Sequence, residues 1–278
     1  MLKNNILLSI LILLIGCKTS KLPSKRYSQV SIKISDEYEN ENLKIDLKNP
    51  LNCPIRIWIN NANKELQTKF DKINPIILES KSDTSFVFFE VENFNKENFY
   101  SASLGNPLKE IKNIKVELPF QKNKEYNIIQ GNDTNYTHNT NYARYAIDFN
   151  LKTNDTICSA TSGFVVGIVD KYEFGGEGDK WKPFGNFITI YEPNSGIFTQ
   201  YVHLVKNGSL VKVGDSIISG QKIALSGETG QTNIEHLHFN CLIPVNDNGN
   251  GMKSIPIEFI EGYKSVDLKK GDWVEKQN

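Results

Sequence analysis

The sequence predicts an all-β protein built from two domains. Short runs in which apolar and polar residues alternate occur along most of the chain, and almost no stretch repeats with a helical period. At 278 residues the chain is long for one compact domain and suits two. We expect an N-terminal β-sandwich-like domain at residues 28–118. A small antiparallel β-barrel or sandwich is expected at residues 120–270.

The first predicted domain consists of short strand-like runs separated by turn residues. The clearest run, I-R-I-W-I at residues 55–59, alternates with a period of two. The other candidate strands in this half are residues 28–34, 42–47, 76–78, 85–91 and 114–118. This half contains no histidine and no catalytic constellation. We therefore expect it to act in spacing or in substrate docking.

The second predicted domain begins after Leu118-Pro119-Phe120 and is denser in glycine. Its candidate strands are two within 156–170, then 185–191, 197–204 and 222–225. A polar, glycine-rich loop at residues 173–182 interrupts them. Small strands joined by glycine turns are typical of a barrel or sandwich.

The N-terminus has the character of a targeting segment. Lys3 precedes an almost wholly apolar run at residues 6–15, which is about half the length of a membrane-spanning helix. L-I-G-C at residues 14–17 resembles a bacterial lipobox, and the alternative is an ordinary secretion signal. We expect residues 1–17 to be a lipoprotein signal segment ending at a lipidated Cys17, followed by a tether at residues 18–27. The protein would then be lipid-anchored to a membrane of the bacterial cell envelope, facing the periplasm or the exterior.

Charge, motifs and cysteine content argue against nucleic-acid or nucleotide binding and against a disulfide-rich or thiolate zinc protein. Lysine and arginine number 32, as do aspartate and glutamate, and no basic stripe indicates a nucleic-acid partner. No glycine-rich phosphate motif indicates a nucleotide. Three cysteines remain beyond Cys17, without a C-x-x-C pair, which argues against a disulfide framework or a thiolate zinc site. We expect Cys158 and Cys241 to be small buried hydrophobic residues.

The four histidines suggest a metal site. His236 and His238 lie in E-H-L-H-F-N-C, where a strand would direct both to one face. Two such rings are costly to bury without partners. Asp148 lies between Ile147 and Phe149, as a carboxylate in an apolar run that also needs a partner. A single histidine is more often a hydrogen-bonded core or surface residue, but we expect this set to converge on one metal ion.

Six motifs in order strengthen that expectation. They are R-Y-A-I-D-F at 144–149, G-N-F-I at 185–188, Y-V-H-L at 201–204, V-K-V-G-D-S-I-I-S-G-Q at 211–221, S-G-E-T-G at 226–230 and H-L-H-F at 236–239. Over residues 120–245 this series resembles the lysostaphin-type (LytM-like) zinc metalloendopeptidases of peptidoglycan. The resemblance implies a zinc-dependent endopeptidase that hydrolyses peptide bonds in bacterial peptidoglycan stem peptides or cross-links.

The resemblance also implies roles for individual residues. One Zn²⁺ ion would be held by His138, Asp148 and His238, with His203 and His236 as the catalytic acid/base pair. The choice between the last two histidines of the chain comes from the family, since the sequence alone leaves it open.

One position departs from the commoner family pattern, which has its first histidine ligand four residues before the aspartate. Arg144 stands there, and a guanidinium cannot bind zinc. Another branch of the family has a histidine about ten residues upstream, and His138 matches it. The alternative is a catalytically inactive member that acts as a cell-wall-binding or amidase-activating module. The two hypotheses differ in whether His138 lies close to Asp148.

Overall fold

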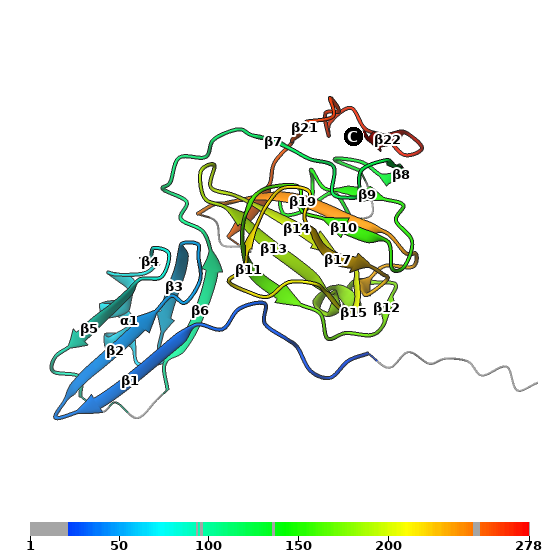
Figure 1. The fold of residues 1–278 in the computed structure, drawn as a ribbon. Coiled ribbons are helices and arrows are strands. Elements are labelled where there is room, and N and C mark those ends of the chain that lie inside the picture. Colours follow the sequence, from blue (N-terminus) through cyan, green and yellow to red (C-terminus); the bar gives the residue numbers. More distant parts are fainter. Residues whose placement is uncertain (1–21, 93, 95–96, 135–136, 247–250, 278) are drawn as a thin grey trace, which may run out of the picture.

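The structure, a computed structural model, describes residues 22–92, 94, 97–134, 137–246 and 251–277. Strands dominate, which confirms the all-β prediction (Figure 1). The N-terminal strands, blue to cyan, lie beside the larger group of strands that follows in the sequence (Figure 1). The boundaries drawn from the sequence between the two domains stay a prediction.

The N-terminal part contains two antiparallel sheets of three strands. One has the order β1-β2-β5 and the other β4-β3-β6. Their strands are β1 (Lys33–Glu39), β2 (Asn42–Lys48), β3 (Ile55–Asn60), β4 (Ile76–Leu78), β5 (Asp83–Phe88) and β6 (Phe99–Leu104). Alternate residues of β2 and β3, such as Ile45 and Ile57, are buried in one shared core with Leu66 and Phe70 of helix α1 (Lys64–Asp71). Each sheet therefore buries one face.

Three features of this part differ from the prediction. Strand β1 begins at Lys33, because the segment before it crosses to the C-terminal part, where the Gln29 carbonyl accepts a hydrogen bond from Ile168 N–H. The sequence also fails to indicate β6, most of whose side chains are only partly buried or exposed. Helix α1 was missed because it buries only two residues, Leu66 and Phe70. Its N-terminus is capped by Asn63, whose side chain accepts from two backbone N–H groups.

The C-terminal part packs a nine-stranded sheet against a three-stranded one. The large sheet has the order β16-β11-β13-β14-β19-β9-β8-β22, with β20 paired to β19, and the small one β10-β17-β15. The strands of the large sheet are β8 (Lys124–Gln130), β9 (Ile147–Phe149), β11 (Gly163–Val169), β13 (Phe187–Glu192), β14 (Ile197–Val202), β16 (Ser216–Ile217), β19 (Leu237–Pro244), β20 (Met252–Ser254) and β22 (Trp273–Lys276). Those of the small sheet are β10 (Thr156–Cys158), β15 (Leu204–Ser209) and β17 (Lys222–Ser226). Ile190, Tyr201 and Phe239 of the large sheet share one core with Ile157 and Ile223 of the small one.

Short pairings complete this part. β7 (Lys115–Val116) pairs with β21 (Glu258–Phe259), and β12 (Gly175–Gly176) pairs with β18 (Gly230–Gln231). The loop predicted at residues 173–182 contains β12 and most of a 3₁₀ helix, η1 (Asp179–Phe184), whose Trp181 and Phe184 form a small apolar cluster with Tyr172.

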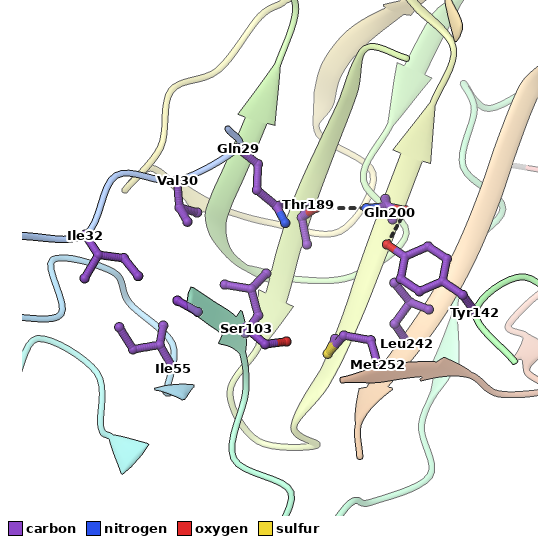
Figure 2. Close-up of a pocket in the computed structure, with 12 residues that line it drawn as sticks. Gln29, Val30, Ile32, Ile55, Ser103, Tyr142, Thr189, Gln200, Leu242 and Met252 are labelled. Carbon is purple, nitrogen blue, oxygen red and sulfur yellow. Dashed lines mark hydrogen bonds between the residues drawn. The ribbon is translucent and has the colours of Figure 1, made fainter. Parts of the chain in front are cut away.

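The outer face of the large sheet packs against the N-terminal part. Phe198 of β14 and Leu242 of β19 belong to the same hydrophobic cluster as the N-terminal strands. A pocket of about 230 Å³ remains between the two parts, lined by Ile55 and Ser103 on one side and by Gln200 and Leu242 on the other (Figure 2). The N-terminal part is therefore fixed to the strand that carries His238.

The cysteine prediction is confirmed for the described residues. Cys158 and Cys241 are buried, with 2% and 1% of their surface exposed, and neither these two nor Cys53 forms a disulfide. Cys17 and the signal segment lie outside the described residues. Within the described ranges, no helix has the length and apolar character needed to cross a membrane.

Candidate metal centre

Two paired strands bring Asp148 and His238 together. β9 runs antiparallel to β19, and His238 lies directly opposite Asp148. Leu237, Phe239 and the β9 residues that flank Asp148 are core residues. Because side chains alternate along a strand, the aspartate and the histidine share the opposite face. Nδ1 of His238 lies 2.9 Å from Oδ1 of Asp148.

His138 reaches the same carboxylate from the loop between β8 and β9. Its side chain is fully buried, and its Nε2 lies 3.2 Å from Asp148 Oδ1 and 3.2 Å from His238 Nδ1. The other ring nitrogen, Nδ1, donates to the carbonyl of Gly131 at 2.9 Å. That bond turns Nε2 toward the carboxylate. Burial lowers the pKa of His138, but the attraction and the hydrogen bond of Asp148 outweigh it and raise that pKa above its ordinary value.

The three side chains fit a zinc ion. The ligand atoms of His138, Asp148 and His238 all lie within 4.8 Å of one another. Ligands held at zinc–nitrogen distances in a tetrahedron lie about 3.3 Å apart, close to the spacings seen here. Two imidazoles and one carboxylate are also a donor set found in catalytic zinc sites, which leave one position open.

The protonation states of His238 and Asp148 suit metal binding. Burial lowers the pKa of His238, and the hydrogen bond to Asp148 opposes this only in part, so the ring is neutral. Burial alone would raise the pKa of the Asp148 carboxyl. The attraction of His236 and His138 and the hydrogen bonds from the neighbouring imidazoles outweigh burial, and they hold that pKa well below its usual range. Neutral imidazole and ionised carboxylate are the forms that bind metals.

His203 lies beside this cluster in an uncommon backbone conformation. It stands between β14 and β15 with a φ of 68°, in the left-handed region that residues other than glycine seldom adopt. Its Nδ1 donates to the carbonyl of Thr229 at 2.6 Å, which leaves Nε2 as the acceptor. Burial, with repulsion from His236 and His238, holds its pKa well below the usual value. The ring is therefore neutral and can accept a proton.

His236 immediately precedes β19, and its ring lies near both His203 and Asp148. Its ring centroid lies 4.4 Å from that of His203, and its Nε2 lies 3.7 Å from Asp148 Oδ2. Its Nδ1 lies 3.0 Å from the carbonyl of Ile234. The structure thus brings together the four histidines and the aspartate singled out from the sequence.

The remaining sequence candidates lie outside the cluster. Arg144 is half-exposed, and its Nε lies 3.4 Å from Oδ1 of Asp133. Tyr201, the first residue of the Y-V-H-L motif, is fully buried, and its hydroxyl accepts a hydrogen bond from Ala160 N–H. It belongs to the core.

Two residues that sequence reasoning missed hold His203 in place. The side chain of Asn186 donates to the carbonyls of Tyr172 and Leu204 and accepts from Tyr172 N–H. The Thr229 hydroxyl accepts from Asn186 N–H and donates to Leu204. Both are buried. The only signal for them was their presence in the G-N-F-I and S-G-E-T-G motifs.

The part of the chain that carries this site matches a known protein family. Residues 142–252 match peptidase family M23. The match contains Asp148, His203, His236 and His238, whereas His138 lies four residues before it.

Two relatives show how far the sequence similarity extends. Lysostaphin of Staphylococcus simulans is 33% identical over 122 residues, which are 43% of this chain and 22% of that protein. The peptidoglycan DD-endopeptidase ShyB of Vibrio cholerae is 49% identical over 59 residues, which are 21% of this chain and 13% of that protein. The matched segments thus span less than a quarter of either relative.

Solved structures include similar chains. The catalytic domain of lysostaphin from Staphylococcus simulans has 26% identity and a TM-score of 0.33, covering 47% of this chain and 87% of that one. A zinc-containing peptidase from Vibrio cholerae has 16% identity and a TM-score of 0.38, covering 88% and 86%.

Proposed function

We propose that the protein, whose residues 142–252 match peptidase family M23, is a zinc-dependent endopeptidase of bacterial peptidoglycan. It would hydrolyse peptide bonds in stem peptides or cross-links. The observation that carries the proposal is the convergence of His138, Asp148 and His238, with His203 and His236 beside them. The name of one matched relative, a peptidoglycan DD-endopeptidase, supports the substrate class.

His138, Asp148 and His238 would hold one Zn²⁺ ion through Nε2, a carboxylate oxygen and Nδ1. Zinc bound there would supply Lewis-acid chemistry, polarising a peptide carbonyl and acidifying water. With a single carboxylate among its ligands, the site would keep a net positive charge. Asp148 would balance only part of that charge.

His203 is suited to take the proton from the attacking water. Its Nδ1 is committed to Thr229, so Nε2 is the atom that receives the proton. Its lowered pKa keeps that nitrogen free at neutral pH. General-base catalysis of this kind contributes about 10²–10⁴-fold to a rate.

His236 is suited to stabilise negative charge on the substrate carbonyl oxygen. Its Nε2 approaches Asp148 at 3.7 Å, and its ring adjoins His203. A donor placed where charge develops in the transition state is worth more in a buried site than in water. The two histidines would therefore act as a pair, one accepting a proton and the other donating a hydrogen bond.

The inactive alternative rests on Arg144, which occupies the usual position of the first ligand. The proximity of His138 to Asp148, at 3.2 Å, favours the enzyme, because a lost ligand would leave the carboxylate with one histidine fewer. The proposed substrate would place the protein in the cell envelope. Lipidation at Cys17 would anchor it there.

A peptidoglycan digest tests the proposal. The purified chain carrying Cys17→Ser would be incubated with peptidoglycan, with and without a zinc chelator, and released fragments identified by mass spectrometry. We expect new peptide ends that disappear with the chelator and return with added zinc. Peptidoglycan that stays intact but retains the protein would support the binding module instead.

A further inference from the structure

The first of the three metal ligands lies on a different kind of element from the other two. Asp148 and His238 are held by the ladder between β9 and β19. His138 lies on the loop of residues 137–146, which contains no strand. A ligand on a strand is positioned by the backbone hydrogen bonds between paired strands. A ligand on a loop is positioned by the contacts that the loop makes with the rest of the protein. The contacts of this loop therefore decide whether the site is assembled before metal arrives.

The start and the end of the loop are tied to the segment that follows β8. Asp133 N–H donates to the carbonyl of Arg144 at 2.6 Å. The Asn132 side chain donates to the carbonyl of Ala146 at 2.9 Å. With the bond from His138 to Gly131, these contacts close the base of the loop.

The middle of the loop is held from outside by one serine of β20. The backbone N–H and the hydroxyl of Ser254 both approach the carbonyl of Asn141, at 2.9 Å and 3.1 Å. The same hydroxyl oxygen accepts from Tyr145 N–H at 3.1 Å. Ser254 is 3% exposed and lies opposite Leu242 of β19. Ser254 thus joins the His138 loop to β20, the neighbour of the strand that carries His238.

The N-terminal part extends this support through Arg56 of β3. The guanidinium donates to the carbonyls of Val245 at 2.7 Å and Gly251 at 2.6 Å, on either side of the connection between β19 and β20. It also donates to Leu104 of β6 at 2.9 Å. Arg56 is 1% exposed, so these bonds from a charged donor lie away from water, where they are strong.

The loop itself also contacts the sheet. The Tyr142 hydroxyl donates to the side-chain oxygen of Gln200 of β14 at 3.0 Å (Figure 2). The backbone carbonyl of Tyr142 accepts a hydrogen bond from the side chain of Asn240 of β19 at 2.6 Å. Tyr142 also packs against the hydrophobic cluster of the N-terminal part. One side of the loop therefore contacts β14, β19, β20 and the hydrophobic cluster that includes the N-terminal strands.

We propose that Ser254 is a positioning residue for the metal centre, and that Arg56 makes the N-terminal part a brace for the loop that carries His138. The identity of the ion rests on the function proposed above, but the brace is a property of this chain. Binding weakens in proportion to the fraction of molecules that are competent to bind. Releasing the loop would therefore lower zinc affinity even though every ligand is still present.

Ser254→Ala tests the brace, with Ser209→Ala as the matched control. Ser209 also accepts from a backbone N–H and donates to a carbonyl, both of Val211, within the small sheet. Zinc dissociation constants would be measured on the metal-free full chains by competition with a chromophoric chelator. We expect Ser254→Ala to weaken binding roughly tenfold, the lower end for outer partners of metal ligands. Ser209→Ala should bind as the unmodified chain does.

A second measurement reports on the loop without zinc. Hydrogen exchange of the Tyr145 amide, which loses its acceptor in Ser254→Ala, should accelerate, while the amides of the ladder between β14 and β19 keep their rates. Arg56→Met should weaken zinc binding in the same direction, and Arg56→Lys, which keeps a charge and three donors, should do so less. The lysine variant also provides a measurement if Arg56→Met does not fold.

The outcomes separate the two proposals. Unchanged zinc affinity and loop exchange in Ser254→Ala would overturn the brace, whatever the enzyme does to peptidoglycan. An unmodified chain that binds no zinc would overturn the metal assignment and the brace with it. Failure to cut peptidoglycan, with zinc affinity that still falls in Ser254→Ala, would overturn the proposed activity alone.

Discussion

His138 Nε2 lies 3.2 Å from Asp148 Oδ1, although ten residues and a loop separate the two in the sequence. Arg144, which is nearer in sequence, points instead to Asp133. The residue that completes the candidate site is therefore supplied by a loop and lies outside residues 142–252, where the family match falls. Substitutions at the two positions should have opposite consequences.

His138→Ala should abolish the metal site, whereas Arg144→Ala should preserve it. Removing one of three protein ligands should weaken zinc binding by more than about 100-fold, beyond the range for outer partners. The ion pair of Arg144 is exposed, with a median contribution of about 0–1 kcal/mol for such pairs, so its loss should leave zinc affinity and stability nearly unchanged. Zinc titration of both variants checks this, and full zinc occupancy in His138→Ala would contradict it.

The strand-borne part of the site was predictable because strands have a fixed period. Asp148 alternates with Ile147 and Phe149, and His238 alternates with Leu237 and Phe239, so each polar side chain leaves the core on the opposite face. His138 could be assigned only through the family resemblance. A loop has no period, and the sequence does not determine where its residues lie relative to a strand.

The residues that support the site could not be predicted for a similar reason. Ser254 and Arg56 contact backbone groups of segments far away in the sequence, and nothing local distinguishes them from an ordinary strand serine and arginine. Strand β1 was misplaced because residues 28–32 alternate as a strand does but pack across the C-terminal sheet. Tertiary contacts outweighed the local pattern in each case.

His203→Ala should reduce turnover while leaving zinc bound. The ring receives the proton in the proposed reaction and is not among the ligands, so kcat should fall about 10²–10⁴-fold. Zinc content, measured on the purified variant, should remain one ion per chain. Zinc loss with turnover lost in parallel would show instead that His203 is a ligand.

Thr229→Val should disturb His203 indirectly. The buried hydroxyl accepts from Asn186 N–H and donates to the Leu204 carbonyl, and valine leaves both groups without that partner. We expect a loss of about 1–3 kcal/mol in the free energy of unfolding, and a lower kcat with zinc retained. Urea unfolding and steady-state kinetics check the two effects.

Thr161→Val is the matched control for that substitution. Thr161 is also buried, but its hydroxyl lies 3.5 Å from that of Thr199 and makes no contact with the His203 turn. Its kcat should equal that of the unmodified protein. An equal fall in kcat in both variants would mean that the buried threonine hydroxyls act through general stability, not through His203.

The ion pair between Glu117 and Lys276 should make stability depend on pH. Lys276 Nζ is 2.7 Å from Glu117 Oε2 and donates to the Leu118 carbonyl at 2.8 Å, with its side chain 3% exposed. Burial opposes ionisation of Glu117, but the hydrogen bonds from Lys276 and Ser219 outweigh it and lower the pKa of the carboxyl below its ordinary value of 4.5. Stability from this group is therefore complete above that value and is lost as the pH falls through the folded-state pKa.

Glu117→Gln measures this contribution, with Glu258→Gln as its control. At about pH 7 the first substitution should lower the free energy of unfolding by about 1–3 kcal/mol, because it weakens a bond to a buried charge. In a second measurement at acidic pH, below the ordinary value of 4.5, the difference should shrink as the pH falls through the lowered folded-state pKa of the unmodified carboxyl. Glu258 is about half-exposed and pairs with Lys115 at 3.5 Å, so its substitution should matter little at either pH. A loss in Glu117→Gln that is the same at both pH values would show that the lost contact is steric and not ionic.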